Sequence, residues 1–175
     1  FATMGIHMGI PFVQGAQGCT TYVRYTFCRI FKEPATIANA SFHEDSAVFG
    51  GMNNFIEGIR NLVIRYRPQV IGVVTTCSSE IIGDDMVSFI KMAQQRLAKE
   101  ADPKIQNVKI VLINTPSFVG SHVVGYDRAS KAFLSTLVQE KTGENNRINI
   151  IPGMLNPGEL REIKHMLNPM GVEHH

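Results

Sequence analysis

Four short, continuous apolar runs constrain the fold of this chain more than any other feature of its sequence. They cover residues 10–13, 70–74, 108–113 and 148–151, and Gly, Pro, Asn or Thr borders each run. Strands with one face in solvent alternate apolar and polar residues, whereas these runs are continuous. They therefore predict strands that are covered on both faces.

Helical patterns lie between these runs. Apolar residues recur at helical spacing in three stretches, 55–66, 86–97 and 129–138. The third helix is expected to end near Gly143. A fourth is expected from Asn156, with Pro157 at its first position and Gly171 as its C-cap. Because strands that alternate with helices build parallel sheets, the sequence predicts an α/β fold: a Rossmann-like parallel sheet with helices on both faces.

The polar stretch 141–147 is the best candidate for a domain boundary. We expect residues 1–144 to form a Rossmann-like domain that is incomplete at its N-terminal side. Residues 145–175 are expected to begin a second Rossmann-like domain that is truncated. The chain starts at Phe1 within an apolar run and stops directly after the last predicted helix, where a strand is expected next. We therefore expect it to be a piece of a longer polypeptide.

Composition and charge exclude several classes of function. Hydrophobic residues make up 44% of the 175 residues, enough for a packed core, and 17 Lys and Arg face 15 Asp and Glu. This near balance argues against a nucleic-acid partner, which would favour a basic excess. No apolar run approaches the roughly 20 residues of a membrane span. The three cysteines are odd in number and widely spaced, a poor disulfide framework that favours a cytoplasmic location.

Two cysteines and a serine follow three successive predicted strands. Cys19 lies in a Gly-rich turn after the first strand, at the start of a helix expected from Thr20. Cys77 follows the second strand and Ser117 follows the third. Ligands of open parallel sheets bind outside the carboxyl ends of the strands. If the three strands are neighbours in the sheet, these three side chains converge at one edge.

Two interpretations of these residues remain open from spacing alone. The first is a thiolate-ligated iron–sulfur or other soft-metal site, with the serine hydroxyl as an optional oxygen ligand. The second is ordinary packing, since free cysteines are among the most buried residue types. Two thiolates cannot close a cluster, so a metal site would need ligands from elsewhere. Cys28 lies on the opposite face of the helix that carries Cys19 and is expected to pack in the core.

Other polar motifs do not complete a known site. The pair at 43–44 lacks the second histidine of a zinc HExxH helix, and Ser121 beside His122 lacks a GxSxG elbow. The turn at 15–18 lacks both the GxGxxG pattern and the P-loop lysine, so nucleotide binding is not expected. Asp84 is expected to cap the helix that follows it rather than to bind a cation.

Five segments, in order along most of the chain, resemble one known family. They are QGAQGC at 14–19, FKEP at 31–34, HEDSAVFGG at 43–51, TTCSSEIIGDD at 75–85 and TPSFVGS at 115–121. Together they closely resemble the β subunit of nitrogenase component 1. The resemblance favours the metal-site interpretation of the two cysteines over ordinary packing.

The resemblance implies a specific cluster site. In that family the β subunit contributes cysteine thiolates to the P-cluster, an 8Fe-7S electron relay that it shares with the α subunit. Cys19 and Cys77 match two of the β-side ligands, and Ser117 matches the serine whose hydroxyl can bind an iron of the oxidised cluster. The family's third β-side cysteine lies upstream, and no cysteine precedes Cys19 here. That ligand is therefore expected to lie outside this chain.

Two aromatic residues match further positions of the family. Tyr22, one helical turn beyond Cys19, matches an aromatic position near the relay. Phe49 matches the surface on which the ATP-driven iron-protein reductase docks, and ordinary packing beside the two glycines that follow it is the alternative. Both residues are therefore candidates for electron transfer or docking.

The resemblance also implies the activity and partners of a nitrogenase. The β subunit would relay electrons from the iron-protein reductase through the P-cluster to a cofactor held by the α subunit, where dinitrogen is reduced to ammonia. Two αβ pairs would form a heterotetramer, with or without an additional small subunit. Segments 41–45 and 76–83 look more like the vanadium or iron-only types, and the helix at 20–28 favours an iron-vanadium cofactor over an iron-only or iron-molybdenum one.

Two other functions stay open. One is a cofactor-assembly scaffold or a relative of the dark-operative protochlorophyllide reductases, which share the fold and some motifs. The corresponding scaffold subunit lacks the cysteine that matches Cys77, so Cys77 favours the catalytic subunit. The other is a metal-free α/β binding domain with buried cysteines.

Overall fold

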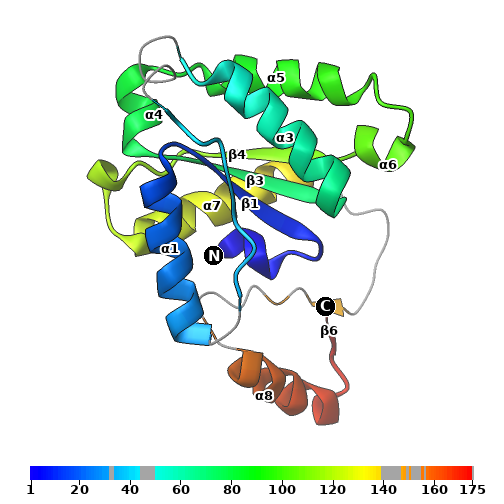
Figure 1. Cartoon of the computed structure of the whole chain (residues 1–175). Coiled ribbons are helices and arrows are strands. Elements are labelled where there is room, and N and C mark those ends of the chain that lie inside the picture. Colours follow the sequence, from blue (N-terminus) through cyan, green and yellow to red (C-terminus); the bar gives the residue numbers. More distant parts are fainter. Residues whose placement is uncertain are drawn as a thin grey trace.

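A computed structural model describes residues 1–31, 34–43, 50–138, 147–148, 150, 155 and 157–174. Four strands form one parallel sheet with the spatial order β2-β1-β3-β4 (Figure 1). They are β1 (Gly9–Gln14), β2 (Ala38–Asn39), β3 (Val70–Thr75) and β4 (Lys109–Ile113). The first three predicted apolar runs thus form β1, β3 and β4, which are hydrogen-bonded neighbours. The predicted α/β fold is confirmed.

Helices follow the strands. They are α1 (Gln17–Phe31), α3 (Met52–Tyr66), α4 (Cys77–Ile82), α5 (Met86–Leu97), α6 (Pro103–Gln106), α7 (His122–Leu137) and α8 (Pro157–Leu167), with the 3₁₀ helices η1 (Ala2–Gly5), η2 (Ser117–Val119) and η3 (Asn168–Met170). The three predicted helical stretches lie in α3, α5 and α7. In the part of the chain that the structure describes, no helix is long and apolar enough to cross a membrane.

The end of α7 differs from the prediction. The helix stops at Leu137, because Val138 takes an extended backbone conformation with φ −74° and ψ 130°. Valine is branched at Cβ, which disfavours the helical backbone relative to the extended one. The predicted end near Gly143 was therefore wrong, since apolar periodicity alone does not mark the residue at which a helix stops.

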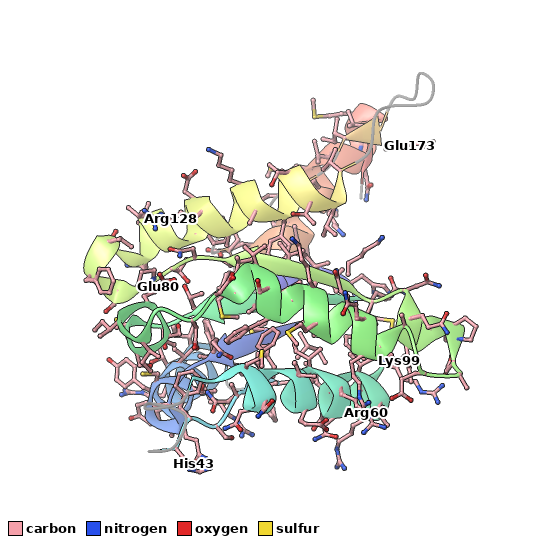
Figure 2. The ribbon with its side chains drawn as sticks, turned by 90° about the horizontal axis from the view of Figure 1, so that it is seen from above. His43, Arg60, Glu80, Lys99, Arg128 and Glu173 are labelled. Carbon is pink, nitrogen blue, oxygen red and sulfur yellow. The ribbon has the colours of Figure 1, made fainter. Side chains whose placement is uncertain are left out.

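Both faces of the sheet are covered, as the continuous apolar runs predicted. Figure 2 shows α7 on one side of the sheet and α3 and α5 on the other. On the α3 and α5 side, the buried rings of Phe12 and Phe55 pack edge to face with their centroids 5.4 Å apart. On the other side, Val111 and Ile113 belong to a buried cluster with Phe133 of α7. This burial of apolar surface is the main stabilising contribution to the sheet.

The C-terminal part contains a second, two-stranded sheet. β5 (Arg147–Ile148) pairs in parallel with β6 (Glu173–His174). The helix predicted in this part is confirmed, since α8 begins at Pro157. Gly171, at φ 69°, caps η3, which follows α8 directly. The predicted domain boundary at 141–147 lies outside the described residues except for Arg147, and the division into two domains stays a prediction.

Candidate metal centre

The three candidate ligands follow neighbouring strands. β1, β3 and β4 are adjacent and parallel, so their carboxyl ends lie at one edge of the sheet (Figure 1). Cys19 lies in the first turn of α1 after β1, Cys77 begins α4 after β3, and Ser117 begins η2 after β4. Figure 2 shows Glu80 of α4 at this end of the sheet and Arg60 and Lys99 near the other end. The three strands are therefore neighbours in the sheet, as the predicted convergence of the three side chains requires.

A local capping box stabilises the turn that carries Cys77. Thr76 is the N-cap of α4, and its hydroxyl accepts a hydrogen bond from the backbone N–H of Ser79. In return, the hydroxyl of Ser79 accepts from the N–H of Thr76 at 3.0 Å. This reciprocal capping box satisfies N–H groups that the first turn of a helix leaves free. It fixes the backbone at the residue where the strand becomes a helix.

Cys77 and Ser117 are in direct contact. The Sγ atom of half-buried Cys77 lies 2.8 Å from the Oγ atom of Ser117, and the backbone N–H of Ser117 donates to the same sulfur at 3.3 Å. The Ser117 hydroxyl and N–H favour the charged form and so lower the pKa of the Cys77 thiol below its ordinary value. Thiolate is the form that binds metals. The two side chains therefore present a sulfur and an oxygen ligand side by side.

Asn39, which the sequence did not predict to have a role, stabilises the turn that carries Cys19. The side-chain amide of Asn39, on β2, donates to Thr20 Oγ1 at 2.6 Å and lies 3.3 Å from the carbonyl oxygen of Gly15. Its own oxygen accepts from the backbone N–H of Ser41 at 2.6 Å. The helix starts at Gln17 rather than at the predicted Thr20. Cys19 is exposed in its first turn.

The remaining candidates have different surroundings. Tyr22 is 73% exposed on α1, where a partner can reach it. Cys28 is half-buried rather than fully packed in the core. His43 is exposed. Phe49 lies outside the described residues, so its role stays a prediction.

Asp84 does not cap α5. The cap is its neighbour Asp85, whose carboxylate accepts from the N–H and the hydroxyl of Ser88 at 3.1 and 2.6 Å. These two bonds lower the pKa of Asp85. Asp84 instead accepts from the side-chain amide of Gln14 at 2.9 Å and from the N–H of Gly51 at 3.2 Å. Two adjacent carboxylates are both suitable caps in the sequence, and this tertiary contact selects between them.

Four of the elements that follow these strands carry a strongly exposed apolar side chain. Four exposed side chains, which we call the apolar rim, lie on α1, α4, η2 and α7, and each is between 63% and 78% exposed. They are Tyr22, Ile81, Phe118 and Val123. Large apolar side chains with such exposure are candidates for contact with another protein.

The donor set suits a soft-metal cluster only if further ligands come from outside the described residues. Cys77 and Ser117 lie together, and Cys19 is exposed at the end of the neighbouring strand. Within the described ranges, no three His, Cys, Asp or Glu side chains are grouped closely enough to hold a metal ion. Iron–sulfur clusters require thiolate ligands, and two from this chain leave the others to a partner or to another segment.

Comparison with known proteins identifies the same family along the whole chain. A model of the family described as nitrogenase component 1 type oxidoreductase matches residues 1–175. The chain is 58% identical over 174 residues to a nitrogenase molybdenum-iron protein beta chain from Methanococcus maripaludis, covering 99% of this chain and 38% of that protein. It is 44% identical over 175 residues to a nitrogenase vanadium-iron protein beta chain from Trichormus variabilis, covering 99% and 37%.

These relatives do not favour the vanadium type over the molybdenum type, because the molybdenum-iron chain shares the higher identity. The chain spans under two fifths of the length of either relative. The fold agrees as well. The solved structure of nitrogenase Cp1 at pH 6.5 superposes with a TM-score of 0.88 at 36% identity, over 99% of this chain and 37% of that one.

Proposed function

Because this chain belongs to the nitrogenase component 1 type oxidoreductase family, we propose that it is part of a nitrogenase β subunit that relays electrons. The electrons come from an iron-protein reductase and pass to a metal cofactor that the α subunit holds. That cofactor would supply the chemistry that reduces dinitrogen to ammonia. Cys19, Cys77 and Ser117 are this chain's ligands to a P-cluster at the interface between the two subunits.

One observation carries this proposal. The sulfur of Cys77 and the hydroxyl of Ser117 lie 2.8 Å apart, although 40 residues separate them in the chain. A thiolate beside an oxygen donor would suit an iron that changes its ligands with oxidation state. When bound, an 8Fe-7S cluster would supply reversible electron transfer at this edge of the sheet.

The chain's own residues hold this edge in place. Thr76 and Ser79 fix the start of α4, and the hydroxyl and N–H of Ser117 stabilise the thiolate of Cys77. Rigid placement on strand ends keeps the reorganisation that accompanies electron transfer small. Tyr22 projects from the same helix as Cys19, next to the path that electrons would take.

The apolar rim is the surface that we assign to the α subunit. Exposed apolar side chains around an incomplete ligand set are expected where a partner buries them and supplies the missing ligands.

Two αβ pairs would form the heterotetramer, and Phe49 would belong to the reductase-docking surface. Free cysteines at such a site require a reducing compartment, which favours the cytoplasm. We retain 1–144 and 145–175 as the two domains.

Elemental analysis of the intact parent complex, purified without oxygen, tests this function. We expect many iron atoms per αβ pair. Molybdenum, vanadium or neither of them in the same sample identifies the type of the partner's cofactor. Little or no iron in an intact complex that was protected from oxygen would overturn the proposal. It would favour the alternative that both cysteines are ordinary packed residues.

A pair of cysteine variants tests the site itself. Cys77→Ala is expected to remove the electron paramagnetic resonance signal of the oxidised P-cluster and to weaken the αβ interface. Cys28→Ala is the matched control, because Cys28 is half-buried on the face of α1 away from Cys19. A normal P-cluster spectrum in Cys77→Ala would exclude Cys77 as a ligand.

A further inference from the structure

One residue is bonded to both ends of the helix that carries Cys77. Gln14, the fully buried last residue of β1, accepts a hydrogen bond at its backbone carbonyl from the hydroxyl of Thr76 at 2.8 Å. Its side-chain amide donates to a carboxylate oxygen of Asp84 at 2.9 Å. Thr76 immediately precedes α4, and Asp84 follows the left-handed Gly83 that ends it. Gln14 therefore contacts α4 at its start and just beyond its end.

The second carboxylate oxygen of Asp84 extends this contact to α3. It accepts from the backbone N–H of Gly51, the N-cap of α3, at 3.2 Å. A carboxylate can only accept hydrogen bonds, so the amide nitrogen of Gln14 has to face Asp84. Its amide oxygen is then buried without a hydrogen-bond partner among the described residues. Burying an unpaired amide oxygen is destabilising, so the bond from the amide nitrogen to Asp84 offsets part of this cost.

Two glycines make these contacts sterically possible. A methyl group on Gly15 would overlap the hydroxyl of Thr76, and one on Gly51 would lie 2.7 Å from the amide nitrogen of Gln14. Neither neighbour can retreat easily, because each is held by the hydrogen bonds described above. Glycine at both positions therefore leaves the room that the Thr76 hydroxyl and the Gln14 amide occupy.

We propose that Gln14 and Asp84 are positioning residues, which fix α4 at both ends and so hold Cys77 beside Ser117. The helix has six residues and little stability of its own, so its end contacts determine its orientation. The contact between Cys77 and Ser117 joins α4 to η2, and hydrogen-bond energy falls steeply when such a distance grows. The proposal rests on the proposed function only for the identity of what Cys77 binds.

Disulfide trapping measures this geometry without any metal. In the intact parent complex carrying Ser117→Cys, with its iron removed by a chelator, oxidised glutathione joins the introduced thiol to Cys77 and takes up the two electrons. We expect Asp84→Ala, which removes the bonds to Gln14 and to Gly51, to slow formation of this disulfide at least roughly fivefold, the effect of losing one ordinary hydrogen bond. Asp85→Ala is the matched control, since it removes the neighbouring carboxylate and a helix cap but not the bond to Gln14. Equal rates in the two variants would overturn the proposal.

Two further variants separate positioning from folding. Asp84→Asn can still accept from Gly51, and its amide can donate to the oxygen of Gln14 once the Gln14 amide turns over, so the trapping rate is expected to be retained. Gln14→Met keeps the backbone carbonyl and loses the amide, so its rate should fall like that of Asp84→Ala. The double variant should be no slower than Asp84→Ala alone, because that substitution already removes the bond that Gln14→Met breaks. Additive effects, or a slow Asp84→Asn, contradict the proposal.

The loaded complex gives a second readout. We expect the midpoint potential of its iron–sulfur cluster to shift in Asp84→Ala and to stay unchanged in Asp85→Ala. A purely structural role would lower stability in both variants and move the potential in neither. If the complex contains no cluster, the proposed function fails, whereas the trapping rates still decide whether Gln14 and Asp84 position Cys77.

Discussion

The two cysteine-bearing turns lie on neighbouring strands but are held in different ways. At Cys77 the helix cap is made by Thr76 and Ser79, both within three residues of the cysteine. At Cys19 the turn is held by Asn39, which lies 20 positions further along the chain. The helix cap of the first turn is therefore made by neighbouring residues, with Gln14 adding a contact from β1, whereas the second turn depends on a residue of β2.

The difference extends to the thiols. Cys77 is half-buried and in contact with Ser117, whereas Cys19 is exposed and has no hydrogen-bond partner within the described part of the chain. If the proposed cluster forms, this chain's own contacts fix the position of the Cys77 sulfur, whereas the Cys19 sulfur is less closely held by the described residues. We infer that the Cys77 turn is the reference point of the site.

The largest expected effect tests whether both turns serve one cluster. Cys19→Ala in the intact complex should lower the iron content and the P-cluster signal as strongly as Cys77→Ala, because a cluster needs every one of its thiolates. Metal analysis and electron paramagnetic resonance measure both. An unchanged iron content in Cys19→Ala would mean that Cys19 is not a ligand of the cluster that Cys77 binds.

The next effect tests the long-range support of the Cys19 turn. Asn39→Ala leaves the buried hydroxyl of Thr20 and the N–H of Ser41 without their partner. We expect it to lower the free energy of unfolding by about 1–3 kcal/mol. Urea denaturation of the full-length chain measures the change.

The control for this variant is Asn114→Ala, which removes an amide of an exposed residue that donates to Glu80. Its effect should stay within about 0.5 kcal/mol. Similar losses in both variants would show that the amide of Asn39 has no special role in the turn.

The same contrast explains what the sequence could predict. The runs that form β1, β3 and β4 are continuous and apolar, so the sequence predicts both the strands and their burial. The two-residue strand β2 has no such signal, because Ala38 and Asn39 form a strand only by pairing with β1. The role of Asn39 could not be predicted from the sequence for the same reason.

Asp84 gives the second example. A carboxylate in the sequence Gly-Asp-Asp before an apolar helix predicts a cap, and the structure gives that role to Asp85. Asp84 is selected by Gln14 and Gly51, residues 70 and 33 positions away. Local chemistry thus predicted the kind of interaction correctly and its residue incorrectly, because the choice depends on contacts between distant segments.

A smaller effect tests the local support of the Cys77 turn. Thr76→Ala removes the hydroxyl that caps α4 and the bond to the carbonyl of Gln14. We expect a loss of about 1 kcal/mol in the free energy of unfolding. Thr76→Ser keeps the hydroxyl and should keep most of that stability in the same urea titration. A loss in Thr76→Ser equal to that in Thr76→Ala would assign the effect to the methyl group instead.

The smallest expected effect concerns the reactivity of Cys77 in the metal-free complex. The hydroxyl and N–H of Ser117 lower the pKa of the Cys77 thiol, so more of it is thiolate at pH 7 than in an ordinary cysteine. Ser117→Ala removes the hydroxyl and keeps the N–H, which raises this pKa partway back. Alkylation of Cys77 by iodoacetamide should therefore slow a few-fold near pH 7 and converge with the unaltered protein above the ordinary thiol pKa.

Mass spectrometry resolves the two cysteines in one sample, which makes Cys19 an internal control for access and for reagent concentration. The rate at Cys19 should not change in Ser117→Ala, because the Ser117 hydroxyl contacts the sulfur of Cys77. Equal slowing at both thiols would mean that the substitution altered the whole edge of the sheet. A rate change confined to Cys77 that persists at high pH would mean altered access rather than altered ionisation. Only slowing that is confined to Cys77 and fades at high pH supports a thiolate stabilised by its own subunit.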